Sequence, residues 1–374
     1  MKKTLFAIML FYFLPSEPIT IAAGNNYSPW LRTSDWKDGI EIIRNSKEPL
    51  HRNGSIRFAD DLIIGSEGDP EKLISIIGGI VVDDSGDIFI VDTKESRILK
   101  YDAKGNYITK FGTHGQGPGE FESPAYITMS AKGELFIRDS KRFSVFSQEG
   151  RYLRGYPSSI LNEIERCAID RNGNGYGVRL LLLKKPPYTR ELIKFDSNFK
   201  SLRTFETYEI PYSRDESIDP FRPSLMNVAL TEEGLVMVAT QDRYEIRFFD
   251  ADGQLKKRIL KDYDPVPVTK RDKDAILEGA PDSFVRNFRP SEYFPAWKKV
   301  FCGSKGRIFV ETYERALYND APHFDIFDSR GRFFCKASIA GITTLYLKND
   351  YVYMLDVTDE GYHVIRRKRI VWSE

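Results

Sequence analysis

The sequence has few of the residues on which redox, metal and catalytic sites depend. It contains three cysteines and four histidines among 374 residues. Because Cys167, Cys302 and Cys335 are widely spaced in apolar stretches, they predict neither a disulfide framework nor a zinc cluster, and we expect them to be buried. The motifs G-x-S-x-G and H-E-x-x-H do not occur, which removes the sequence signals of two large hydrolase classes.

Neither sign of charge is in excess. The chain carries 55 basic and 54 acidic residues, a formal net charge of +1. There is no basic stripe of the kind that binds nucleic acid and no polybasic segment for anionic lipid. We therefore expect neither nucleic acid nor a membrane surface as a partner.

The longest apolar run is short and lies at the N-terminus. Residues 5–14 are apolar, follow Lys2 and Lys3, and precede a small-residue site near Ala22, Ala23 and Gly24. This order predicts a signal peptide over residues 1–23, and ten apolar residues are too few to span a bilayer comfortably. The mature chain is then periplasmic or extracellular, with no transmembrane segment after signal removal.

The rest of the chain is dominated by short β-strand patterns. Residues 80–124 predict four strands, rich in β-branched and aromatic residues, at 80–83, 87–91, 97–102 and 107–111. The gaps between them contain Gly, Asp, Asn or Ser, which favour tight turns. A four-stranded meander cannot bury both of its faces alone, so it needs neighbours of the same kind.

Two markers repeat along the chain in the same phase. A turn that ends in glycine before a second strand occurs at Gly86, Gly133, Gly173, Gly234 and Gly306. An aromatic residue followed by a polar turn ends each third strand from Tyr101 to Phe327. The repeats predict six units, at residues 80–124, 125–160, 165–211, 226–262, 299–343 and 344–372.

The sixth unit has only three strands, and residues 57–64 supply a strand in the right phase to complete it. The fold class is therefore predicted as all-β, a six-bladed β-propeller whose last blade is closed by an N-terminal strand. Residues 24–55 form an N-terminal leader segment, which we expect outside the ring or across one face, and residues 56–374 form the propeller.

The stretches VVDDSGDIFIVDTKESRILKYDAKG and FGTHGQGPGEFESP resemble the NHL-type six-bladed propellers of secreted bacterial proteins, and the resemblance extends over residues 38–371. It implies the fold and says little about activity, because such propellers host unrelated functions.

All long insertions are expected at one end of the ring, which we call the long-loop end. There the second strand of a blade leads to the third and the fourth leads to the next blade. Loops concentrated on one end of a rigid scaffold suggest a binding surface. The aromatic, guanidinium and imidazole side chains predicted to bind there are Arg179, Tyr188, Arg190, Arg289, Trp297, Tyr313, Arg315 and His323.

The favoured hypothesis is a non-catalytic, monomeric propeller that binds a peptide, a glycan or a partner protein. The alternative is a lactonase-like hydrolase or a lyase, with calcium or zinc held near the channel mouth by Asp92, Asp139, Asp356 and His114. An aspartate that ends a second strand also has a structural interpretation, because it can accept loop amides. Likewise, the glycine-rich residues 112–121 are interpreted as a linker between blades and not as a phosphate loop.

Overall fold

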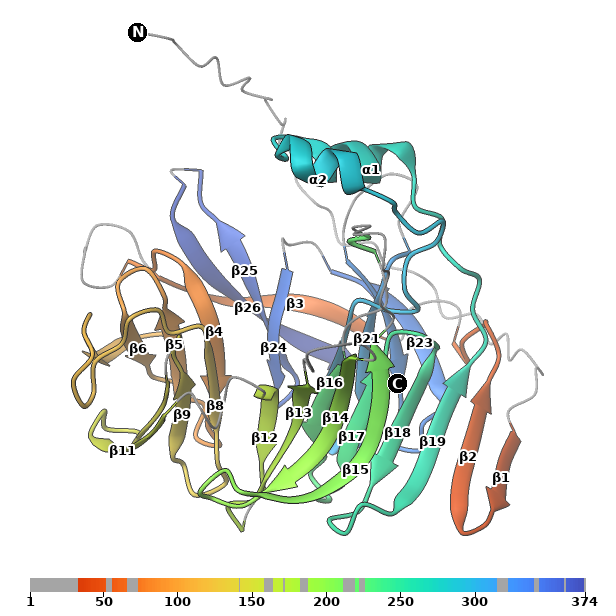
Figure 1. The fold of residues 1–374 in the computed structure, drawn as a ribbon, viewed down its shortest axis with the longest axis horizontal. Helices are drawn as coiled ribbons and strands as arrows, with labels where there is room; N and C mark the ends of the chain where they lie inside the picture. Colours follow the sequence, from red (N-terminus) through yellow and green to blue (C-terminus); the bar gives the residue numbers. More distant parts are fainter. Residues whose placement is uncertain are drawn as a thin grey trace, which may run out of the picture.

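The computed structural model describes residues 33–51, 56–65, 73–140, 142–157, 164–170, 172–181, 188–210, 219–221, 226–314, 322–339, 343–359 and 361–372. Its strands form six sheets arranged around a ring (Figure 1). No helix in these ranges is both long and apolar enough to cross a membrane.

In each of the first five blades, four strands form a meander that follows the chain order from the channel outward. The first three blades are β4 (Ile77–Val82), β5 (Ile88–Asp92), β6 (Arg97–Tyr101) and β7 (Tyr107–Phe111); β8 (Tyr126–Met129), β9 (Leu135–Arg138), β10 (Arg142–Phe146) and β11 (Tyr152–Pro157); and β12 (Ile164–Ile169), β13 (Gly175–Leu181), β14 (Tyr188–Phe195) and β15 (Ser201–Ile210).

Blades four and five are β16 (Met226–Leu230), β17 (Val236–Thr240), β18 (Glu245–Phe249) and β19 (Leu255–Lys261); and β20 (Lys299–Cys302), β21 (Ile308–Thr312), β22 (His323–Phe327) and β23 (Phe333–Ser338). The sixth comprises β24 (Thr343–Lys348), β25 (Tyr351–Val357), β26 (His363–Trp372) and β3 (Ile56–Ile64). Strand β3 pairs antiparallel with β26, from Ile64 opposite Ile365 to Ile56 opposite Trp372. The predicted six blades and N-terminal closure are confirmed.

The leader segment runs along the outside of the ring. Strands β1 (Thr33–Lys37) and β2 (Ile40–Asn45) form a hairpin, and β2 pairs parallel with β19, which extends blade four to six strands. The amides of Leu50 and His51 then donate to Phe333 and Phe334 of blade five. The chain therefore binds the outer edges of blades four, five and six in succession.

The core lies between the blades. Strands β5, β17 and β21 are buried at every position, as expected for a second strand that is covered on both faces. Their sequences are consequently runs of Val, Ile, Phe and Met, and they lack the apolar-polar alternation of a half-exposed strand. This packing fixes the direction of every strand and hence the end at which each loop emerges.

The opposite end of the ring, which we call the tight-turn end, is built from short turns. Its connections are closed by hydrogen bonds from the fourth residue to the first, such as Gly133 N to Ser130 O at 2.9 Å. In the turn of residues 196–199, the position that is glycine in most other turns is Phe199, with φ of 61°. Its ring is buried and stacks on Phe195 at 5.1 Å, which offsets the strain of that conformation.

The long-loop end carries the two described α-helices. Helix α1 (Lys270–Leu277) begins at a capping box between Thr269 and Asp272, and α2 (Asp282–Asn287) follows it. Both helices stand above the ring in Figure 1, on the side of the turn between β25 and β26. They belong to the insertion between blades four and five, which we call the arm (residues 262–298).

Candidate functional site

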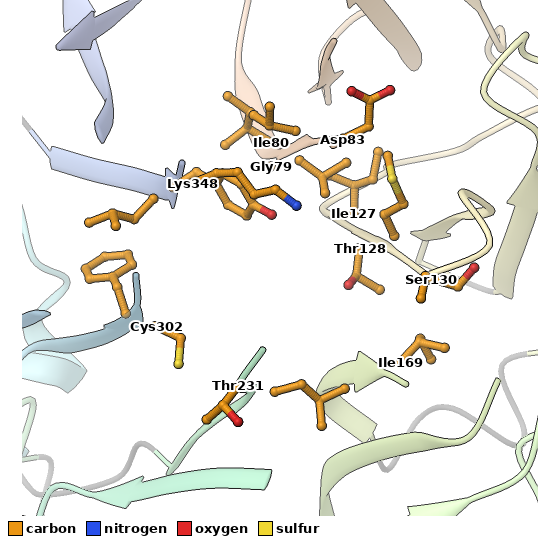
Figure 2. Close-up of a pocket in the computed structure, with 18 of the residues that line it drawn as sticks. Gly79, Ile80, Asp83, Ile127, Thr128, Ser130, Ile169, Thr231, Cys302 and Lys348 are labelled. Atoms are coloured by element: carbon orange, nitrogen blue, oxygen red, sulfur yellow. The ribbon is translucent and has the colours of Figure 1, made fainter. Parts of the chain in front are cut away.

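The first strands of the six blades surround a central cavity of about 1730 Å³. Each of these strands is an edge strand, because it pairs with another strand on one side only. Side chains of neighbouring blades bind some backbone carbonyls of these edges, as Tyr126 Oη does to Cys167 O at 2.8 Å, and the remaining N–H and C=O groups favour water or a polar ligand. Figure 2 shows the lining, which combines apolar side chains such as Ile127 with the hydroxyls of Thr128, Ser130 and Thr231.

Two charged side chains of the cavity, Lys348 and Asp83, are bound to other groups of the protein. Lys348, whose side chain extends into the channel in Figure 2, forms an ion pair of 2.7 Å with Asp84. Asp83 accepts hydrogen bonds from Ser85 Oγ and the amide of Asp87. The described lining also includes the thiol of Cys302, whose pKa burial raises to about 12, so it is a poor nucleophile.

The aspartates predicted as metal ligands hold the loops between blades. Asp92 is fully buried and accepts the amides of Ser75 and Ile76 at 3.3 and 3.2 Å. Asp139 does the same for Glu122 and Ser123 at 2.9 and 2.6 Å. In both cases the amides belong to the connection that enters the same blade, so the carboxylate fixes the preceding loop and not the following one.

The other two proposed ligands do not complete a metal site. Asp356 accepts a hydrogen bond from the amide of Val357 and forms an ion pair with Arg366. His114 is exposed, and its Nδ1 lies 3.5 Å from Ser96 Oγ. In the described residues, no three His, Cys, Asp or Glu side chains converge in a way that could hold a metal ion. The ligand set predicted for calcium or zinc is therefore not assembled there.

The glycine-rich linker is filled by a guanidinium group. Arg142 donates to the carbonyl oxygens of Gln116, Gly117 and Glu120 at 2.6 to 2.7 Å. A phosphate loop would instead direct its amides toward an anion. The carbonyls converge on a cation that is part of the chain, which supports the interpretation of residues 112–121 as a linker.

Three insertions from different parts of the ring meet at one aromatic residue of the arm. The ring of Phe294 stacks on Tyr313 at 4.3 Å and contacts Phe221 edge-on at 5.1 Å. Phe221 belongs to the connection between blades three and four, and Tyr313 to the loop after β21. Ser291 of the arm also binds Asp219 through its amide, at 3.1 Å. We call Phe221, Phe294 and Tyr313 the aromatic junction.

A buried carboxylate lies beside this junction. Glu311 is 5% exposed, its Oε1 is 3.9 Å from Lys298 Nζ, and its Oε2 has no hydrogen-bond partner in the described part of the chain. Burial raises the pKa of Glu311, while the charges of Lys299 and Lys298 act against that rise. Burial also raises the pKa of Tyr313 to about 12. Lys298 lies over the Tyr313 ring at 5.2 Å and so links the carboxylate to the junction.

The structure distributes the residues predicted to bind at the long-loop end over blade three, the arm and blade five. Arg179 is paired with Glu191, at 3.0 Å from Nε, and Tyr188 and Arg190 lie partly buried on β14. Arg289 is exposed on the arm and donates to the carbonyls of Arg286 and Phe288. Arg315 lies outside the described residues.

Trp297 was predicted at the binding surface, and the structure places it in the core instead. It is 1% exposed, and its Nε1 donates to the carbonyl of Thr240 at 3.0 Å. This burial anchors the arm between blades four and five and removes Trp297 from the binding set. His323 is partly buried; burial lowers its pKa, and Nε2 has no hydrogen-bond partner among the described residues.

Exposed apolar side chains gather at the long-loop end, a feature that the sequence reasoning missed. In the described residues ten large apolar side chains are exposed, and the six at this end are Ile76, Ile276, Val285, Tyr293, Val357 and Tyr362. The other four, Trp36, Ile63, Ile108 and Leu202, lie on β1, β3, β7 and β15. The turns of the tight-turn end contribute none of the ten.

Comparisons with known proteins agree with this architecture. Residues 64–212, less than half of the chain, match a protein family described as "6-bladed beta-propeller". A search of curated proteins finds no match. The structure is that of a six-bladed β-propeller by blade count, closure and family match. The description of the matching family does not mention NHL repeats, so the NHL-type resemblance stays a prediction.

Solved structures share the fold at low sequence identity. A candidate exported protein from Bacteroides fragilis is 11% identical with a TM-score of 0.56, and the match covers 88% of this chain and 99% of that one. A protein from Bacteroides vulgatus is 10% identical with a TM-score of 0.50, covering 85% and 99%. Virginiamycin B lyase from Staphylococcus aureus is 10% identical, covering 84% and 100%, and its TM-score of 0.43 carries no argument about activity. These likenesses show the fold alone.

Proposed function

We propose that this chain is an exported, non-catalytic propeller that binds a partner protein or peptide through its long-loop end. The observation that carries the proposal is the concentration there of six of the ten exposed large apolar side chains of the described residues. Exposed apolar side chains gathered on one surface are typical of interaction sites. The aromatic junction supports this function, because it gives loops from separate blades one fixed arrangement.

The chemistry of the exposed residues favours a protein over a glycan. Ile76, Ile276 and Val357 are aliphatic and between 38% and 48% exposed. A glycan offers mainly hydroxyl groups, which aliphatic side chains cannot bind, whereas a protein partner offers apolar groups to cover them. The metal-dependent hydrolase or lyase has no comparable support, since Asp92 and Asp139 use their oxygens on backbone amides.

The experiment compares two triple variants, each of which replaces three exposed apolar side chains. The first variant, which we call the rim variant, carries Ile76→Ser, Val357→Ser and Tyr362→Ser at the long-loop end. The control carries Ile63→Ser, Ile108→Ser and Leu202→Ser on outer strands. Both are immobilised beside the wild type, and proteins captured from the source cell envelope are quantified by mass spectrometry. We expect the rim variant to lose at least about tenfold of its specific partner, while the control retains it.

Circular dichroism and thermal melting must first show that both variants are folded. Equal capture by the two variants would contradict the proposal, as would a loss of capture in the outer-strand control alone.

A further inference from the structure

One guanidinium group between blades three and four has buried N–H groups without an acceptor in the described residues. Arg247 lies on β18, and its guanidinium carbon is 5.0 Å from the centre of the Tyr208 ring on β15. Eight buried side-chain nitrogen and oxygen atoms of the described residues have no hydrogen-bond partner there. Four of the eight are Nε and Nη2 of Arg247, the Tyr208 hydroxyl and Oε2 of Glu206. We call these three residues the interblade cluster.

The two carboxylates near Arg247 do not serve these donors. Glu206 Oε2 lies 2.9 Å from Arg247 Nη1, in an ion pair that lacks the alignment of a hydrogen bond and leaves the Nε–Nη2 edge of the guanidinium unpaired. Glu245 is buried and accepts from Nε of Arg258, and its other oxygen lies 3.7 Å from Arg243. The donors of the cluster therefore need an acceptor from outside the described residues.

The same three residue types are fully paired in blade two. Arg154 donates from Nη1 and Nη2 to the two oxygens of Glu134 and from Nε to the hydroxyl of Tyr156, each at 2.8 Å. Its guanidinium carbon also lies 6.0 Å from the centre of the Tyr156 ring, so contact with a tyrosine ring does not prevent these hydrogen bonds. Buried donors without acceptors destabilise a fold, and the interblade cluster is therefore suited to binding an acceptor that blade two does not need.

The geometry of the unpaired donors favours a carboxylate as that acceptor. The Nε–H and one Nη2–H of a guanidinium point the same way, and this edge matches the planar oxygens of a carboxylate. Arg179 uses the same edge in blade three, where its Nε and Nη2 both donate to Glu191. In the interblade cluster the Tyr208 hydroxyl adds a further donor. Because a guanidinium is always charged, an anion satisfies these donors better than a neutral acceptor does.

The cluster lies just beneath the surface, and its own carboxylate is weakly held. The side chains of Arg247 and Glu206 are 13% and 26% exposed. Burial raises the pKa of Glu206 even though the charge of Arg247 lowers it, so the ion pair between them does not compensate for the burial of Glu206. A movement of the Glu206 side chain toward solvent therefore costs little and opens a path to Arg247.

We propose that the interblade cluster is a binding site for a carboxylate group, which Arg247 binds through Nε and Nη2 and Tyr208 binds through its hydroxyl. The Glu206 side chain turns toward solvent as the carboxylate enters. The carboxylate belongs to an acidic side chain of a partner or to a free small acid. The site is separate from the surface under the proposed function, because the residues replaced in the rim variant belong to blades one and six.

Calorimetric titration of the full mature chain with acetate tests this site, with chloride as the reference at the same ionic strength. We expect Arg247→Lys, which keeps the charge but loses the paired N–H groups, to weaken acetate binding at least about tenfold. Tyr208→Phe, which removes only the hydroxyl, should weaken it about threefold. The control Arg154→Lys and the rim variant should bind acetate as the wild type does.

Circular dichroism and thermal melting in chloride first show that each variant is folded, and Tyr208→Phe keeps the test valid if Arg247→Lys is not. A wild type that binds acetate no better than chloride leaves the donors of the cluster to water and overturns the proposal. Wild-type affinity in both cluster variants would overturn it as well.

Nuclear magnetic resonance of protein with isotope-labelled arginine locates the contact. The Nε–H signal of Arg247, assigned by its loss in Arg247→Lys, should shift as acetate is added, while that of Arg154 should not. A tripeptide with one aspartate, blocked at both ends, distinguishes the two sources of the carboxylate. Binding tighter than that of acetate indicates a partner's side chain, and equal or weaker binding indicates a free small acid. An Arg247 signal that responds to neither probe rejects the proposal.

Discussion

The pKa values of two carboxyl groups, one at each end of the ring, are shifted in opposite directions. At the tight-turn end, hydrogen bonds from the side chain and then the amide of Asn106 hold the pKa of Asp102 below its usual value. At the long-loop end, Glu311 is buried with one oxygen lacking a partner among the described residues, and burial raises its pKa. The first arrangement satisfies each polar group within its own turn. The second leaves an unsatisfied group beside a junction of loops.

This difference separates framework from candidate site. Closed turns with satisfied aspartates recur at the tight-turn end and fix the length of every strand pair, as in Asp328, which accepts the amides of Arg330 and Arg332. The long-loop end has varied insertions, exposed apolar side chains and imperfectly satisfied polar groups. Unfavourable features of this kind collect where a protein binds something.

The largest expected effect tests whether the tight-turn end tolerates any side chain. Gly331 has φ of +74°, and a Cβ there would lie 2.7 Å from Ile259 Cδ1 and 2.9 Å from Ile43 Cδ1. Gly331→Ala should therefore lower the free energy of unfolding by about 3 kcal/mol, combining roughly 1–2 for the left-handed backbone with roughly 1–3 for overpacking. Chemical denaturation measures this loss.

Two further glycines separate the backbone effect from the packing effect. Gly234 at the tight-turn end and Gly279 in the arm also have positive φ, of +82° and +73°, but a Cβ at either meets nothing within 4 Å. Each alanine variant should lose only about 1 kcal/mol by the backbone term, and Gly279→Ala should affect the arm and not the ring. Similar losses at Gly331 and Gly234 would show that packing does not distinguish these turns.

The ring itself was predictable from sequence because its determinants are local and repeated. A turn such as residues 83–86 needs a polar residue and a glycine at fixed spacing, so each copy can be recognised without knowledge of the others. Closure by β3 followed from the same phase, since the sixth unit had one strand too few. The parallel addition of β2 to β19 was not predicted, because no turn or spacing connects those strands in the sequence.

The candidate site was less predictable because its contacts join insertions that have no common pattern. Phe221, Phe294 and Tyr313 are far apart in the chain, and only the ring geometry brings them together. Trp297 was predicted to bind at the long-loop end as an aromatic residue of a long insertion, yet it precedes β20 closely enough to enter the core between blades. Which member of an aromatic cluster is buried depends on the angle at which the loop leaves the blade.

The second prediction concerns the aromatic junction. Phe294→Ala removes a stacked and an edge-on ring contact, worth about 2 kcal/mol together at roughly 0.5–1.5 kcal/mol for each pair. Because the junction holds the arm and not the blades, this loss should appear mainly as local opening. Limited proteolysis should cut the arm at least about tenfold faster, while the main thermal transition moves much less.

Tyr293→Ser provides the control for this experiment, since Tyr293 is adjacent in sequence but 45% exposed. Its cleavage rate should stay close to that of the wild type. If Phe294→Ala lowers the main thermal transition of the ring as strongly as it speeds cleavage of the arm, then the long-loop end is part of the framework. The contrast between the two ends would then be wrong.

The smallest effect is expected from Glu311→Gln, which keeps the shape of the side chain and removes its charge. Since burial raises the pKa of Glu311 in the folded chain, its protonated form stabilises the fold below the ordinary pKa of 4.5, and this contribution is lost as the pH rises through the folded value. At pH 7 the variant should therefore be more stable than the wild type, by on the order of 1 kcal/mol, the low end for a buried polar group without a partner.

Denaturation of both proteins at a series of pH values checks the sign as well as the size of this effect. The advantage of Glu311→Gln should shrink toward zero as the pH falls below 4.5, because the wild-type carboxyl is then neutral too. Asp102→Asn should show the reverse, with a loss at neutral pH that disappears in acid, since the pKa of that carboxyl is lowered. If Glu311→Gln is instead less stable at pH 7, the Lys298 and Lys299 charges outweigh burial, and Glu311 is a paired framework carboxylate like those of the opposite end.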